Sequence, residues 1–219
     1  MIVYLVPARA RFELYSEAPE DPTDQPASDD GWFRRWMHKA VVQWRQMVDS
    51  ARNGSGAGRF ARWRDRLVRH LAESIAEQRT LWALRQASGA TARFPATIAS
   101  ADARAALDRL LAHARRHHRR WLIIDLVATA ITGPLFFFVP GPNVISLYFT
   151  FRFLGHFLSW RGARQAMDRT SWTLEPDAGL AELAGLVDVP RATRAPRVAA
   201  IAAQLNLPRL SAFFDRVTV

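Results

Sequence analysis

The clearest pattern in the chain is a pair of long apolar runs separated by a sharp turn signal. The runs cover residues 121–139 and 144–160, and "PGPN" lies between them. Prolines on both sides of a glycine do not continue a helix, so we expect a tight turn between two antiparallel helices. Helices of these lengths measure about 28 Å and about 25 Å, close to a hydrocarbon core of about 30 Å. The pattern predicts a two-helix transmembrane hairpin, with its basic flanks, over residues 115–170. The residues of its turn are Pro140, Gly141, Pro142 and Asn143.

Each apolar run also contains ionisable residues, at similar distances from the turn. Asp125 lies about 16 residues from the turn centre and His156 about 14, which places them within about 3 Å of the same height. Since an unpaired charge in hydrocarbon costs at least about 2.5 kcal/mol, we expect the polar stripes of the two helices to face each other. The candidates for an ion path or an interhelical lock are Asp125, Thr129, Tyr148, Arg152 and His156.

Two functions remain open for this polar set. It is either a neutralising lock that fixes the register of the helices, or a relay that passes a proton or contacts a cation. A single helix pair encloses no water-lined path, so transport would require a homo-oligomer or a membrane partner protein. A globular alternative also remains, in which both runs are central core helices around a dry ion pair. In that case, much protein would have to cover "GPLFFFVPGP".

The N-terminal third predicts a small sheet, a linker and basic helices. Short apolar and alternating runs predict a β-hairpin over residues 1–16, and "SWTLEP" at 171–176 predicts a third strand. Residues 17–30 form an acidic linker. Apolar residues then recur at helical spacing, on an arginine-rich background, in a basic amphipathic region over 31–114.

Two further patterns predict helices in the remaining chain. Ser100 is a suitable N-cap, followed by Asp102, for a helix that runs directly into the first apolar run. The C-terminal region, residues 171–219, contains three short helical patterns, "AELAGLV", "PRVAAIAAQLNL" and "RLSAFFDRV". We find no internal repeat.

The net positive charge of the chain indicates which kinds of molecule it could bind. The formal net charge is +10, and Lys39 is the only lysine among the basic residues. Such a balance favours a phosphate-bearing partner, either an anionic membrane surface or nucleic acid. Nucleic acid is the weaker alternative because no nucleic-acid motif is present. Tryptophan beside arginine suits lipid headgroups. The predicted membrane-interface residues are Trp32, Trp36, Trp44, Trp63, Trp121, Trp160 and Arg161.

The sequence contains none of the usual catalytic or metal-binding signatures. The absence of cysteine excludes disulfides, thiolate zinc sites and iron–sulfur clusters. There is no phosphate-binding loop, nucleophile elbow or H-E-x-x-H motif, so we expect neither an enzyme nor a cofactor. His113 and His117 have metal-ligand spacing, but no third ligand is apparent nearby, and we predict no metal site.

The segment "VPGPNVISLYFTFRFLGHFLSWRGARQAMD" resembles the mitochondrial K+/H+ exchange-related family. The resemblance lies in the Pro-Gly-Pro-Asn turn, an aromatic second segment with an internal arginine, and a closing His-x-x-x-Trp-Arg. It is strongest over residues 115–172 and implies an integral membrane protein associated with exchange of K+ and H+. It carries over no catalytic residue. The start resembles no transit peptide, and together with the arginine-dominated composition this indicates a bacterial relative.

The sequence therefore predicts a mainly α-helical protein with a small β element, anchored by the transmembrane hairpin. Both soluble parts would face the cytoplasm at the bacterial inner membrane, or the corresponding side of the mitochondrial inner membrane. The first functional hypothesis is participation in K+/H+ exchange or its regulation. The alternative is a non-transporting membrane scaffold that binds anionic lipid or a partner protein.

Overall fold

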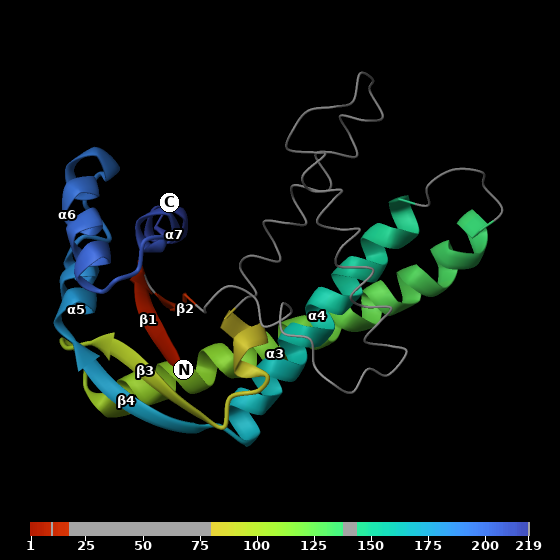
Figure 1. Ribbon diagram of the computed structural model, residues 1–219, viewed down its shortest axis with the longest axis horizontal. Coiled ribbons are helices and arrows are strands. Elements are labelled where there is room, and N and C mark those ends of the chain that lie inside the picture. The colour runs from red at the N-terminus through yellow and green to blue at the C-terminus, as the bar shows by residue number, and fades with distance from the viewer. Residues whose placement is uncertain (10, 18–79, 138–143, 219) are drawn as a thin grey trace. The chain divides into compact units, whose positions relative to one another are not determined.

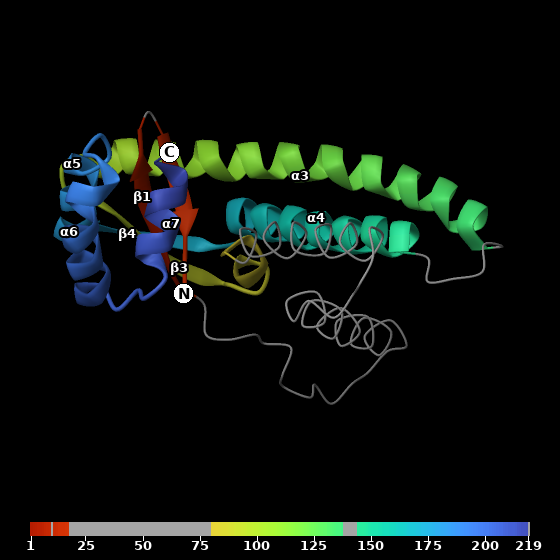
Figure 2. The same ribbon diagram turned by 90° about the horizontal axis from the view of Figure 1, so that it is seen from above.

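The structure is a computed structural model that describes residues 1–9, 11–17, 80–137 and 144–218 (Figure 1). The described residues belong to two compact units. The first contains residues 1–9, 11–17, 80–119 and 158–218, and the second contains residues 120–137 and 144–157. Two helices contribute to both units, α3 (Ser100–Phe137) and α4 (Val144–Asp168), and Figure 2 shows α3 as one continuous helix.

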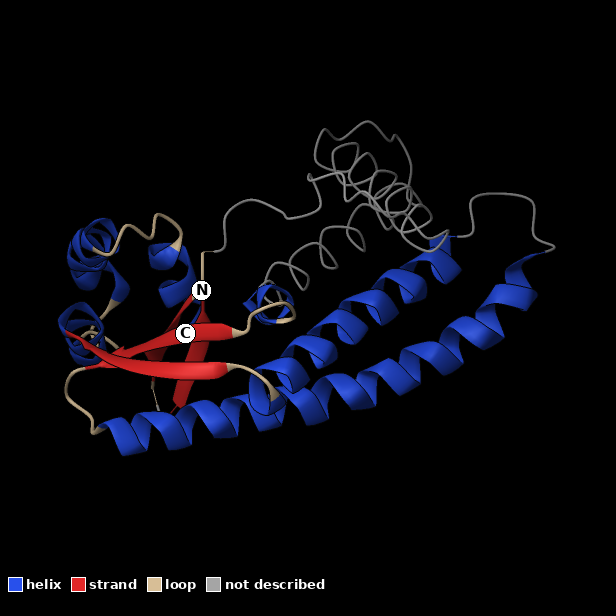
Figure 3. Ribbon diagram, turned by 60° about the horizontal axis from the view of Figure 1, so that its bottom comes forward, coloured by secondary structure: helices blue, strands red, loops and turns tan. Residues whose placement is uncertain are grey.

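A four-stranded mixed sheet organises the first unit (Figure 3). Its strands are β1 (Ile2–Ala8), β2 (Arg11–Tyr15), β3 (Gly89–Pro95) and β4 (Ser171–Asp177), in the order β2-β1-β3-β4. β1 pairs antiparallel with β2 and parallel with β3, and β3 pairs parallel with β4. β1 is buried from its second residue to its last, because helices cover both faces of the sheet there.

The alternation of side chains along β1 supplies two separate hydrophobic clusters. Val3 and Leu5 point into the first cluster, and Tyr4 and Val6 point into the second. The first cluster also contains residues of α3, of a helical segment at 80–84 and of the end of α4, among them Leu84, Leu107 and Ala166. The result is a sheet between two helical layers.

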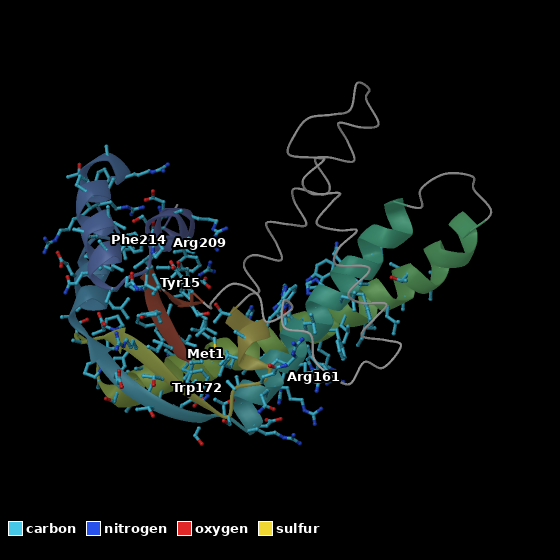
Figure 4. All side chains as sticks on the ribbon, viewed as in Figure 1. Met1, Tyr15, Arg161, Trp172, Arg209 and Phe214 are labelled. Atoms are coloured by element: carbon cyan, nitrogen blue, oxygen red, sulfur yellow. The ribbon has the colours of Figure 1, made fainter. Side chains whose placement is uncertain are left out.

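Three short helices form the layer on the second face. They are α5 (Ala178–Gly185), α6 (Arg191–Gln204) and α7 (Leu210–Val217). Asp177, at the end of β4, caps α5 by accepting a hydrogen bond from the backbone N–H of Leu180. Glu17 joins β2 to the start of α7, because its carboxylate accepts from the Tyr15 hydroxyl and from the Arg209 backbone N–H. Tyr15, Arg209 and Phe214 accordingly lie close together in Figure 4.

The predicted fold class, mainly α-helical with a transmembrane hairpin, is wrong. The described residues form a mixed α/β fold built on the four-stranded sheet. Within them, no helix combines the length and the apolarity needed to cross a membrane. The sequence shows Asp125 within one apolar stretch and Arg152 within the other, with arginines close to both. The predicted small β element was underestimated mainly because β3, "GATARFP", has no strong strand pattern.

Other predicted elements agree with the structure where it describes them. The N-terminal hairpin forms as β1 and β2, the predicted third strand forms as β4, and a helix begins at Ser100. The three C-terminal patterns form α5, α6 and α7. The predicted linker beyond residue 17, the basic helical region up to residue 79 and the turn at 140–143 lie outside the described residues.

Candidate functional site

The second unit brings three of the predicted polar residues together around the carboxylate of Asp125. Asp125 lies on α3 and is fully buried, with 0% of its surface exposed. Arg152 and His156 are four residues apart on α4, so both side chains project from the same face of that helix. We refer to Asp125, Arg152 and His156 as the Asp125 cluster.

Arg152 contacts the Asp125 carboxylate through two of its guanidinium nitrogens. Its Nε donates a hydrogen bond to Asp125 Oδ2 over 3.3 Å, and its Nη2 lies 3.2 Å from Oδ1 in an ion pair. The Arg152 side chain is 23% exposed. Such two-pronged contact is the geometry in which guanidinium and carboxylate bind most specifically. It fixes the register of α3 against α4 in this part of the chain.

His156 approaches the same carboxylate from the next turn of α4. Its Nε2 lies 3.7 Å from Asp125 Oδ2, and only 10% of its side chain is exposed. A protonated imidazole would form a second ion pair at this distance, whereas a neutral imidazole would not. The Asp125 cluster therefore places one permanent cation and one titratable group against a single buried acid.

Trp121 of α3 packs against the two basic side chains of the Asp125 cluster. The indole ring stacks on His156 with centroids 6.2 Å apart and an interplanar angle of 17°. The guanidinium carbon of Arg152 lies 4.7 Å from the centroid of the same ring. Such cation–π contact favours the charged arginine and restricts its side chain. Trp121, predicted as a membrane-interface residue, thus contacts both basic members of the Asp125 cluster.

Burial and the neighbouring positive charge shift the pKa of Asp125 in opposite directions. Removal from water raises the pKa of Asp125, and the neighbouring Arg152 lowers it by charge and hydrogen bonding. Burial is the larger effect, so the pKa lies above the usual value of an aspartate. The site is therefore one where a proton binds more readily than at an exposed carboxylate.

Two buried oxygen atoms of α3 lack hydrogen-bond partners among the described residues. They are Asp125 Oδ1 and Thr129 Oγ1, which are one helical turn apart. Oδ1 is close to Arg152 Nη2, but the contact is an ion pair without hydrogen-bond geometry. Buried polar atoms normally have partners, so these two atoms mark the polar side of α3 at the Asp125 cluster.

The structure does not place the remaining predicted site residues in the Asp125 cluster. Tyr148 lies in α4, and its side chain is outside the described residues. Trp160 and Arg161 belong to the first unit, where the Trp160 ring lies 5.8 Å from the Arg164 guanidinium carbon and Arg161 is exposed on α4 (Figure 4). The predicted interface residues Trp32, Trp36, Trp44 and Trp63 are outside the described residues, as are Pro140, Gly141, Pro142 and Asn143.

The histidines of α3 were weighed as metal ligands from their spacing. His113 and His117 stack with centroids 6.1 Å apart, and His118 meets His117 edge-on. Burial lowers the pKa of His117, helped by the charge of His113. In the part of the chain that the structure describes, no group of three or more histidine, aspartate or glutamate side chains is arranged to hold a metal ion.

A family model described as mitochondrial K+-H+ exchange-related matches residues 2–168, which is more than half of the chain. The chain belongs to this family. The resemblance seen in the sequence is thereby confirmed, and the family's name links it to K+/H+ exchange and to mitochondria. The matched range begins in β1, ends with the last residue of α4 and includes the whole Asp125 cluster. No curated protein and no solved structure matches this family member.

One feature of this family member was not predicted from its sequence, namely an exposed apolar face on α3. Ile124, Val127 and Ile131 each expose half or more of their surface, and the neighbouring Ile123 and Leu126 do the same. The polar stripe that contains Asp125 was expected to face the second helix, and the other side chains of the run were expected to face lipid. Their exposure in the structure follows from the side that the paired charge of Asp125 buries.

Proposed function

We propose that this chain takes part in, or regulates, exchange of K+ for H+, with the Asp125 cluster as its proton-responsive element. Membership of the K+-H+ exchange-related family supports the reaction class. The observation that carries the role of the cluster is a fully buried carboxylate, with a raised pKa, held between an arginine and a histidine. Groups perturbed in this way concentrate at functional sites.

The chemistry of one carboxylate is sufficient for the elementary step of such exchange. An ionised Asp125 binds either a monovalent cation or a proton, and binding of one releases the other. In the described structure Arg152 occupies the cation's role. Protonation of Asp125 would remove the charge that holds Arg152 and His156, and would free both side chains to move. Proton binding is thereby linked to the contact between α3 and α4.

Exchange across a membrane also requires a continuous path for the ions. We propose that the chain acts with a membrane partner protein, or as a homo-oligomer, at the bacterial cytoplasmic membrane or the mitochondrial inner membrane. The Asp125 cluster would then sense protons on behalf of that assembly. K+ and H+ are its proposed ligands, and the family name supports both.

The proposal is tested by measuring K+-dependent proton flux in membrane vesicles from cells with and without the chain. Deletion of the chain should change the flux, and Asp125→Asn should reproduce the change because it removes the titratable group. The amount of folded protein in each preparation is measured in parallel. Arg164→Gln is the control, since it alters an exposed ion pair with Asp168 on α4.

The alternative, a non-transporting scaffold in which the cluster is only a lock, gives a different result. A scaffold would lose function in proportion to the loss of folded or assembled protein. Asp125→Asn would then keep full function whenever it keeps the fold. Unchanged flux in vesicles that lack the chain would contradict the proposed exchange role directly.

A further inference from the structure

The exposed apolar face of α3 forms a continuous stripe with an arginine at its beginning. Arg120, Ile124, Val127 and Ile131 follow one another at spacings of four, three and four residues, so they lie along one side of the helix. Arg120 is exposed, and the three apolar side chains are 51%, 51% and 62% exposed. We call these four residues the α3 stripe.

The α3 stripe lies on the opposite side of the helix from the Asp125 cluster. Asp125 is fully buried, whereas its neighbours Ile124 and Leu126 are more than half exposed. The contacts of the cluster therefore do not use the stripe. Exposed apolar area that runs along a helix away from its buried polar contacts is typical of an interaction surface.

The charge at the start of the α3 stripe identifies the chemistry of its partner. Arg120 is immediately preceded in the sequence by three further arginines, at 115, 116 and 119. Arginine and exposed aliphatic side chains on the same helix face match an anionic bilayer surface on which the helix lies flat, because the arginine reaches the phosphates while the aliphatic side chains enter the outer acyl region. An acidic headgroup complements the arginine, and the acyl region accepts the aliphatic side chains.

A second copy of the chain fits these observations less well. The stripe runs from Arg120 to Ile131, about 12 residues or roughly 16 Å of a helix about 10 Å wide. A stable protein interface needs roughly 800 Å² from each partner, considerably more than one such face supplies. Lipid imposes no minimum area, because each buried side chain adds to the affinity separately.

We propose that the α3 stripe docks this protein on the surface of an anionic lipid bilayer, with Arg120 at the phosphates and Ile124, Val127 and Ile131 among the upper acyl chains. The docking is interfacial. It goes beyond the proposed exchange function and does not rest on it, because it uses different residues and is measured without ion flux.

The test is co-sedimentation of the full chain with vesicles of phosphatidylcholine mixed with phosphatidylglycerol, and with vesicles of phosphatidylcholine alone. The protein should bind the mixed vesicles more tightly, and high salt should reduce the difference. Ile124→Ser and Ile131→Ser should each lower the partition coefficient roughly fivefold or more, because each removes half-exposed apolar surface that lipid would cover. Serine has a helix propensity similar to that of isoleucine, so α3 should persist.

Control substitutions of the same kind, made outside the α3 stripe, show whether a loss of vesicle binding is specific to the stripe. Ile2→Ser makes the same chemical change at an isoleucine of β1 that is 43% exposed, and it should leave vesicle binding unchanged. Arg120→Gln should weaken binding to mixed vesicles about fivefold, as expected for one basic residue near an anionic surface. Arg109→Gln, at an exposed arginine earlier in α3, is its control.

Two outcomes would overturn the proposal. One is equal binding of the wild type and the stripe variants to the mixed vesicles, or no binding by any of them. The other is a change in the oligomeric state of the free protein, measured by sedimentation equilibrium, on Ile124→Ser or Ile131→Ser with unchanged lipid binding. That result would assign the stripe to a second copy of the chain.

Discussion

At the scale of single residues, Asp125 and Arg194 show two ways of burying a charge. Asp125 is fully buried, and burial outweighs its cation in setting its pKa. Arg194, in α6, is 5% exposed, and it donates to the carbonyl of Val187 and the hydroxyl of Thr218. It also forms an ion pair with Asp215. Asp125 can therefore gain or lose a proton within the folded protein. The partners of Arg194 hold that side chain in one place and stabilise the fold.

Asp125→Asn is expected to keep or raise the stability of the second unit at neutral pH. The raised pKa means that folding favours the neutral carboxyl, so this group's contribution is complete below the unfolded pKa, at about pH 4, and is lost as pH rises through the folded pKa. Urea unfolding of wild type and variant across that pH range measures the effect. The variant should lack this component of the pH dependence, and a large loss of stability at every pH would contradict the prediction.

Arg152→Gln should destabilise the second unit by about 2 kcal/mol at neutral pH, because it leaves the buried Asp125 carboxylate without its cation. The partial exposure of Arg152 keeps the cost below that of a fully buried pair. The double variant with Asp125→Asn should recover most of the loss, since no uncompensated charge remains. Urea unfolding of the four proteins in this cycle tests the coupling, and strictly additive effects would count against it.

Arg194→Met should lower the stability of the first unit by about 3 kcal/mol or more, because Asp215 and the carbonyl of Val187 lose a buried partner. The flexible methionine side chain retains much of the packing against Phe214, which lies 5.0 Å below the guanidinium. Arg197 lies on the same helix as Arg194 and forms an exposed ion pair with Glu182 of α5, so Arg197→Gln should leave the unfolding midpoint unchanged. Equal unfolding midpoints for the two variants would contradict the assigned role of Arg194.

At the scale of elements, the helical segment at 80–84 and the end of α4 pack at very close range. Trp82 Nε1 donates to Ser159 Oγ over 2.9 Å, and the Thr170 hydroxyl donates to the Ala87 carbonyl over 2.8 Å. Gly162 permits this approach, because a Cβ built on it would overlap the backbone carbonyl of Leu81. A glycine inside a helix is normally unfavourable, so its presence here reflects the contact.

Gly162→Ala should therefore destabilise the first unit by about 3 kcal/mol, despite the higher helix propensity of alanine. The added methyl group meets backbone, which cannot rotate away as a side chain would. Gly185→Ala is the matched control, since a Cβ at Gly185 meets nothing within 4 Å and the change should be neutral or slightly stabilising. Thermal unfolding followed by circular dichroism compares the two, and equal midpoints would exclude the tight contact.

The elements that could be predicted are those with strong local patterns. β1, β2 and β4 alternate or are β-branched, and α3 has an N-terminal serine with aspartate in its first turn. β3 has mainly small and polar residues and becomes a strand because β1 and β4 pair with it on both sides. The pairing of Asp125 with Arg152 and His156 was predicted from their similar distances to the expected turn and from the cost of an unpaired charge in an apolar run. The exposure of Ile124 and Val127 depends on tertiary packing that no local pattern records.

At the scale of the whole molecule, the first unit is assembled from segments that are far apart in the chain. Ser16 and Thr80 lie on either side of residues 18–79, yet the Ser16 hydroxyl donates to the Thr80 hydroxyl over 3.1 Å. The sheet then continues with β3, followed by the long α3 and α4 before β4. The two points where the chain leaves and re-enters the first unit, at Ser16 and Thr80, are therefore in direct contact.

Replacing residues 18–79 with a short glycine–serine linker should leave the first unit folded. The ends to be joined are already within hydrogen-bond distance, and a shorter connection lowers the entropy cost of closing the loop. Hydrogen exchange should find the amides of β1 and β3 as strongly protected as in the full chain. Loss of that protection would show that the sheet depends on the replaced residues.

β1 packs against segments that lie far from it along the chain. Its residues Val3 and Leu5 need partners from α3, and Tyr4 and Val6 need partners from α5 to α7. While the ribosome is still translating residues 178–217, one face of the emerged strand has nothing to cover it. The first unit therefore completes its folding only after residues 178–217 have been synthesised, and chaperones that shield short apolar strands should have their longest contact with residues 2–8.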